Sequence, residues 1–129
     1  MLTYSGLSKR LLSTVPELRI SYEQQLNVSS GEDPGPHIVF GDVLAPYLIF
    51  LLESGQREDI VRRVFDFLEE LAVHPDLHVQ EVVAQAVVER LAEDKALLSA
   101  ARKYIGPRTL QFVREAGDFW GISHAKDLK

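Results

Sequence analysis

The chain of 129 residues contains no cysteine. This excludes disulfide bonds, thiolate metal sites and cysteine nucleophiles, and it fits a reducing compartment. The N-terminal segment does not resemble a signal peptide, because Lys9 and Arg10 lie in its middle and no long apolar stretch precedes a cleavage site. We therefore expect a cytoplasmic protein.

Long hydrophobic runs are also lacking. The longest, Val43 to Leu52, is interrupted by Pro46 and has about half of the ~20 residues needed to cross a bilayer. The net charge of −5 disfavours nucleic acid, because clustered Lys and Arg side chains supply most of the affinity for phosphates. The sequence predicts neither a membrane nor a nucleic-acid partner.

The patterns that accompany common catalytic sites are missing as well. The serines lack the context of a nucleophile elbow, and no glycine-rich segment joins a strand to a helix as in phosphate-binding loops. We expect no catalytic residue, no cofactor and no enzymatic activity.

What the chain does contain is helical periodicity, with enough hydrophobic residues, 46%, for one domain over residues 1–129. Apolar spacing predicts a helix from Leu7 to Val15. Pro16 can open a second helix to about Leu26, although alternating apolar residues there also permit a strand. Turn-forming residues 27–36 predict a long mobile loop that completes the N-terminal part, residues 1–36.

Residues 37–117 are predicted to form the core helices. Asp42 is expected to cap a helix that ends at Gly55, and residues 58–72 form the clearest amphipathic helix. Asp76 can cap the helix that follows, and its many valines imply that it is buried.

Two shorter helices are expected to end at Gly106 and Gly117, followed by a frayed tail, residues 118–129. The predicted fold is all-α, a compact helical bundle of about six helices. Residues 58–94 resemble a HEAT-like α-hairpin, but no second copy follows at a fixed period.

Acidic residues concentrate in residues 53–94, which contain eleven acids against four arginines. Like charges on a rigid helix can attract a basic partner, although a solvated helix face explains the same residues. Phe67 lies off the apolar stripe of its helix, and with Trp120 it is a candidate exposed anchor. The candidate partner-binding residues are Glu32, Asp33, Glu58, Asp59, Asp66, Phe67, Glu69, Glu70 and Trp120.

His74 and His78 have the four-residue spacing of the zinc-binding HExxH helix, and Glu81 follows three residues later. However, Pro75 occupies the position of the motif's glutamate and separates the histidines into different elements. A pair at a helix junction is therefore favoured, and these three residues are weak metal candidates.

Four phrases carry a family resemblance: HIVFGDVLAPYL from His37, VFDFLEELA from Val64, VVERLAED from Val87 and KYIGPRTLQFV from Lys103. Over roughly residues 37–113, the chain resembles an uncharacterised family of small bacterial all-helical domains. The resemblance implies a single-domain cytoplasmic protein. Some members are encoded near polymorphic or contact-dependent toxins, which implies an immunity protein, and no catalytic residue carries over.

We therefore expect a partner-binding protein, most concretely an immunity protein, as a monomer or homodimer. It would occlude a cognate toxin with a basic surface through its acidic helical face and the loop at residues 27–36. A HEAT-like adaptor that binds a peptide between helices is the second hypothesis. A small metal- or ligand-binding protein that uses the two histidines is the third.

Overall fold

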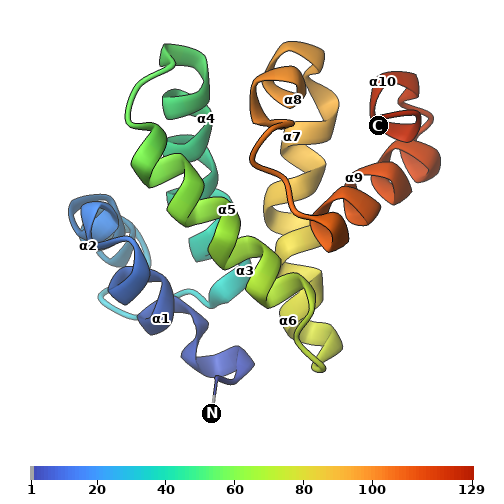
Figure 1. Ribbon diagram of the computed structural model, residues 1–129. Helices are drawn as coiled ribbons and strands as arrows, with labels where there is room; N and C mark the ends of the chain where they lie inside the picture. Colours follow the sequence, from blue (N-terminus) through green and yellow to red (C-terminus); the bar gives the residue numbers. More distant parts are fainter. Residues whose placement is uncertain (1) are drawn as a thin grey trace.

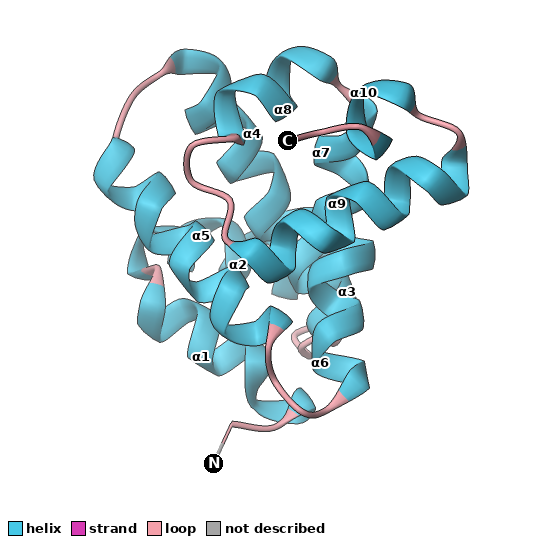
Figure 2. Ribbon diagram, turned by 45° about the vertical axis from the view of Figure 1, so that its right-hand side comes forward, coloured by secondary structure: helices cyan, strands magenta, loops and turns pink. Residues whose placement is uncertain are grey.

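Two long helices form the centre of the molecule, whose computed structural model describes residues 2–129 (Figure 1). The first, Pro36–Ser54, joins α3 (Pro36–Val39), a π-helical segment (Phe40–Leu44) and α4 (Ala45–Ser54). The second joins α6 (Leu77–Glu81), a π-helical segment (Val82–Val88) and α7 (Glu89–Glu93). The two π-helical segments contact each other. No β-strand occurs in residues 2–129, so the predicted all-α class is confirmed (Figure 2).

Small residues allow the two long helices to approach where they cross. Gly41 is buried, and a Cβ atom at this position would lie 3.8 Å from the Cβ atom of Ala86 and 3.3 Å from Nη2 of Arg90. The same Arg90 atom donates a hydrogen bond to Asp42 Oδ1 at 3.2 Å. Asp42 therefore joins the two helices. The sequence had predicted that it would cap one of them, and it does not.

The capping prediction was wrong because the helix begins earlier, with Pro36 in its first turn. Pro46 lies within the continuous helix, directly after the π-helical turn, and a widened turn tolerates its missing N–H group. The resulting helix has 19 residues and a mean hydropathy of 1.4, so by length and composition alone it could cross a membrane. Half of that stretch is buried within the molecule, which is also typical of a core helix.

The N-terminal helices form as predicted. After a 3-10 turn (Tyr4–Gly6), α1 (Leu7–Thr14) packs on α3 and α5, and a second 3-10 turn (Pro16–Leu18) leads into α2 (Arg19–Val28). Because α2 continues to Val28 and the next helix begins at Pro36, the loop is shorter than expected and covers residues 29–35.

Helix α5 (Glu58–Ala72) lies across the molecule in Figure 1 and packs against α1, α4 and α9. Gly55 ends α4 in the left-handed conformation, as predicted, with φ of 67°. Helices α5 and α6 diverge from their turn, and the helix of residues 77–93 packs along Pro36–Ser54 and α9. The HEAT-like hairpin stays a prediction.

The C-terminal helices are α8 (Lys95–Ala101), α9 (Pro107–Trp120) and α10 (Ser123–Lys126). The prediction that Gly117 ends α9 was wrong, since the helix continues to Gly121, whose φ is 69°. Gly117 instead allows α10 to pack closely: a Cβ atom there would lie 2.7 Å from the Ala125 carbonyl carbon.

The tail is not frayed, in contrast to the prediction. Ala125 is fully buried, and His124 Nε2 donates a hydrogen bond to the Ala92 carbonyl at 2.7 Å. Helix α10 therefore packs against α9 and fixes its C-terminal end.

Candidate functional site

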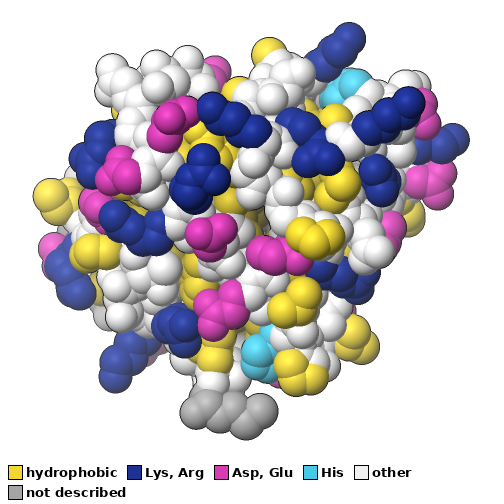
Figure 3. Space-filling view, viewed as in Figure 1, with side chains coloured by type: hydrophobic (Ala, Val, Ile, Leu, Met, Phe, Trp, Pro, Cys, Tyr) yellow, Lys and Arg dark blue, Asp and Glu magenta, His cyan; other side chains and the backbone are white. Residues whose placement is uncertain are grey.

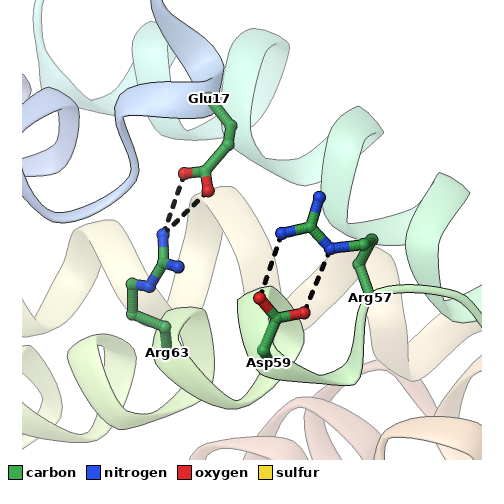
Figure 4. A network of polar contacts seen from close by, with 4 residues as sticks. All are labelled: Glu17, Arg57, Asp59 and Arg63. Carbon is green, nitrogen blue, oxygen red and sulfur yellow. Dashed lines mark hydrogen bonds and ion pairs between the residues drawn. The ribbon is translucent and has the colours of Figure 1, made fainter.

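The first acids of α5 are paired within the molecule. Glu58 accepts hydrogen bonds from Lys103 Nζ at 2.8 Å and from the Tyr104 hydroxyl at 2.9 Å. Asp59 accepts two from Arg57, at 3.1 and 3.0 Å (Figure 4). These donors hold the pKa of Glu58 and that of Asp59 below their ordinary values, because they stabilise the charged form.

The ion pairing continues along the outer face of the same helix. Glu70 pairs with Arg10 at 2.9 Å. Arg63 donates to both carboxylate oxygens of Glu17, at 2.8 and 3.1 Å (Figure 4). Ion pairs this exposed to water contribute little to the stability of the fold. Together they set cations beside the acids, and Figure 3 shows both signs intermixed on the face that α5 crosses. Asp66 is exposed, and its side chain makes no ion pair or hydrogen bond with any other residue in the range 2–129.

Glu69 has a structural role at the start of α9. Its Oε2 atom accepts from the Arg108 backbone N–H at 3.0 Å, and Oε1 accepts from the Thr109 backbone N–H and hydroxyl, both at 2.9 Å. A carboxylate satisfies the free N–H groups at the positive end of a helix. A Cβ atom on Gly106 would lie 2.6 Å from the Glu69 carboxylate carbon, so this glycine lets the carboxylate approach.

The prediction that Phe67 is an exposed anchor was wrong. Its side chain is only 3% exposed, with its ring centroid 6.2 Å from that of Phe40 and 5.9 Å from the Arg10 guanidinium carbon. Phe67 lies off the main apolar stripe of α5, but α1 covers this second side of the helix. The amphipathic pattern of one helix does not show how many neighbours pack on it.

The loop acids differ from each other in their contacts. Asp33 accepts from the Tyr22 hydroxyl and from the Gly35 backbone N–H, both at 2.7 Å, and so braces the loop. The hydrogen bond to Asp33 is the largest of the effects that raise the pKa of Tyr22 to about 12; burial and the Asp33 charge add to it. Glu32 is exposed.

The two histidines do not converge with Glu81 on one point. His74 Nδ1 accepts from the Asp76 backbone N–H at 3.0 Å, and Nε2 therefore donates to the Leu2 carbonyl at 3.0 Å. Both ring nitrogens of His74 are thus engaged. His78 is exposed, with Nδ1 at 3.7 Å from Glu81 Oε2, and no group of three potential metal ligands occurs within residues 2–129.

The end of α9 exposes two aromatic rings side by side. Phe119 is 78% exposed and Trp120 is 59% exposed, and their ring centroids are 4.9 Å apart in an edge-to-face arrangement. Trp120 Nε1 donates to Glu89 Oε1 at 3.4 Å. We name Phe119, Trp120 and the nearby acids Glu89, Glu115 and Asp118 the α9-end surface.

The chain matches the family described as Domain of unknown function (DUF7674) over residues 8–121. It belongs to this family. No curated protein and no solved structure matches the chain. The expected membership of an uncharacterised family is thereby confirmed, whereas an association with toxin genes stays a prediction.

The part of this DUF7674 chain that matches the family includes both α5 and the α9-end surface. Sequence reasoning selected Trp120 but missed Phe119, because the helix was expected to end at Gly117 and residues 118–129 to form a frayed tail. The signal that could have located this surface is Gly121, a second possible helix end, which allows α9 to continue through both aromatic residues.

Proposed function

We propose that this DUF7674 chain is a partner-binding protein that docks through the α9-end surface. The observation that carries the proposal is the exposure of Phe119 and Trp120 on the end of a helix that α10 fixes. Two aromatic rings exposed to water are unfavourable, because burial of their apolar area would lower the free energy. Trp is among the residues most enriched at the energetic centres of protein interfaces.

The acids of this surface favour a basic partner. Glu115 and Asp118 have side chains that are 68% and 74% exposed, and their nearest cations lie 4.0 and 3.9 Å away. Such long, exposed contacts are weak, so both carboxylates are available to new cations. Lys and Arg side chains of a partner could pair with these acids and lie over the exposed rings.

We further propose that the partner is a cognate bacterial toxin and that the chain is its immunity protein. The family resemblance in the sequence supports this choice, because it implies that some members are encoded near toxins. A rigid helix end that bears rings and acids suits direct occlusion of a basic site, since little conformational freedom is lost on binding.

Growth of bacteria that co-express the chain with a toxic product of a neighbouring gene tests this function. The wild-type chain is expected to restore growth, and Trp120→Ala to lose protection. Phe50→Ala is the matched control, because Phe50 is 60% exposed on α4, and this variant should protect like the wild type. If no neighbouring product binds or is neutralised, the immunity proposal fails; protection by Trp120→Ala would reject the docking surface.

A second candidate function, binding of a peptide between helices, is favoured by a groove between α4 and α8. Two hollows of about 310 and 300 Å³ adjoin there and share Leu52 and Ala100 in their lining. Ala100→Trp would fill this groove and leave the α9-end surface unchanged. Loss of partner binding in this variant, with binding retained by Trp120→Ala, would favour the peptide-binding function.

A further inference from the structure

A polar groove between α1 and α2 lies outside the surface proposed for partner binding. It has a volume of about 640 Å³, within the usual ~300–1,000 Å³ of small-molecule sites. Its lining includes Ser5, Ser8, Lys9 and Ser13 from the α1 side and Arg19 from α2. Hydroxyl groups and cations therefore face one hollow.

Ser8 is the most informative residue of this groove. The residue is only 7% exposed, and its hydroxyl has no hydrogen-bond partner in residues 2–129. Thr109, the other buried polar side chain of that range, bonds to Glu69. Every fully buried side-chain polar atom of the described chain has a partner, so the Ser8 hydroxyl must open into the groove. The hydroxyl is therefore accessible from the groove and free to hydrogen-bond to a ligand oxygen.

Lys9 and Arg19 give the groove its charge. Neither side chain forms an ion pair or hydrogen bond with any residue in the described range, unlike those of Arg10, Arg57 and Arg63. The cations come from different helices and line the same hollow.

One acid, Asp33, also lines the groove. Both of its carboxylate oxygens already accept hydrogen bonds, from Tyr22 and Gly35. The lining therefore carries one net positive charge in a chain whose net charge is −5.

We infer that this groove binds a small phosphomonoester, with its phosphate group among Ser8, Lys9 and Arg19. A phosphate has three terminal oxygens for the three donor side chains, whereas a carboxylate has two. An arginine guanidinium can bind two phosphate oxygens at once, and a lysine ammonium adds a point charge. The remaining volume accommodates the organic part of the ligand.

Titration of the folded full-length chain tests the inference, with backbone amide NMR shifts as the readout. Inorganic phosphate and glucose 6-phosphate are added separately, in chloride buffer at constant ionic strength. Both should shift the amides of residues 5–22 in a saturable way, and glucose 6-phosphate should bind more tightly. Arg19→Gln should weaken binding about tenfold, since a charge-assisted hydrogen bond is lost. Ser8→Ala should weaken it by a smaller factor.

Lys95→Gln is the matched control. It removes the same charge from an exposed cation on α8, and it should change the affinity less than twofold. An equal loss in Lys95→Gln and Arg19→Gln would overturn the inference, because only the net charge would then matter. The absence of saturable shifts in residues 5–22 of the wild-type chain would overturn it as well. Neither result bears on the α9-end surface.

Discussion

The outer face of α5 and the end of α9 look similar in sequence but differ in the folded chain. Both combine acids with a candidate aromatic anchor. On α5 the anchor Phe67 is buried, and Glu58, Asp59 and Glu70 have cation partners. At the end of α9 the two rings are exposed, and the acids have only distant cations. Charge along the sequence is therefore a poor guide to charge available at the surface, since tertiary neighbours decide which acids are already satisfied.

Gly117→Ala should have the largest effect on this comparison, because Gly117 lets α10 support the end of α9. The new Cβ atom would meet the backbone of Ala125 and Lys126, which cannot move as a flexible side chain can. Overpacking costs up to about 3 kcal/mol, and the better helix propensity of alanine offsets about 1 kcal/mol. We expect a net loss of about 2 kcal/mol in the free energy of unfolding, measured by urea denaturation.

Gly6→Ala is the control for this variant, because its Cβ atom would meet only Thr3 Oγ1, at 3.6 Å, and the φ of Gly6 is −93°. Its stability should stay within about 0.5 kcal/mol of the wild type. Equal stability of the Gly117→Ala variant and the wild type would show that α10 does not clamp the end of α9.

Glu69→Ala tests whether an acid of α5 has a structural role. It leaves two backbone N–H groups and the hydroxyl of buried Thr109 without their acceptor, at a cost of about 2 kcal/mol. Asp66→Ala, on the same helix, removes a carboxylate without partners and should change stability by less than about 0.5 kcal/mol. Urea denaturation measures the free energy of unfolding of both variants. Similar losses in the two variants would contradict the structural role of Glu69.

The smallest effect concerns the alkaline titration of Tyr22. Its pKa is raised to about 12, and the ordinary value is 10.0, so the folded chain favours the protonated hydroxyl. This contribution to stability is fully present below pH 10 and is lost as the pH rises from 10 to 12. Asp33→Ala should move the Tyr22 titration toward 10, as measured by phenolate absorbance, whereas Glu32→Ala should leave it unchanged. Identical titrations of both variants would contradict the Tyr22–Asp33 bond.

The all-α class and most helix positions could be predicted from the sequence because they depend on local periodicity and stop signals. The stripe of α5, the cap at Asp76 and the stop at Gly55 all belong to one or two turns of chain. Gly117 could not be interpreted locally, because its function is to admit a helix that comes later in the chain.

The candidate site was predicted less completely for the same reason. From the sequence of α5 alone, Glu69 is an ordinary acid on a helix surface. Its role depends on the backbone N–H groups at the start of α9, which lie beside it in the folded chain. Phe67 lies off the main apolar stripe of α5, and it is buried only because α1 packs on that side of the helix. Trp120 was selected correctly as exposed, but its neighbour Phe119 depended on where α9 ends. Contacts distant in sequence determine each of these outcomes.

The most direct test of the central claim is calorimetric titration of a toxin that the chain neutralises against two variants. If the end of α9 is the docking surface, Trp120→Ala should weaken binding about 30-fold, which corresponds to about 2 kcal/mol for an interface anchor. Asp66→Asn, which neutralises the unpaired acid of α5, should then bind within twofold of the wild type. The reverse pattern, with affinity lost in Asp66→Asn and kept in Trp120→Ala, would contradict the account.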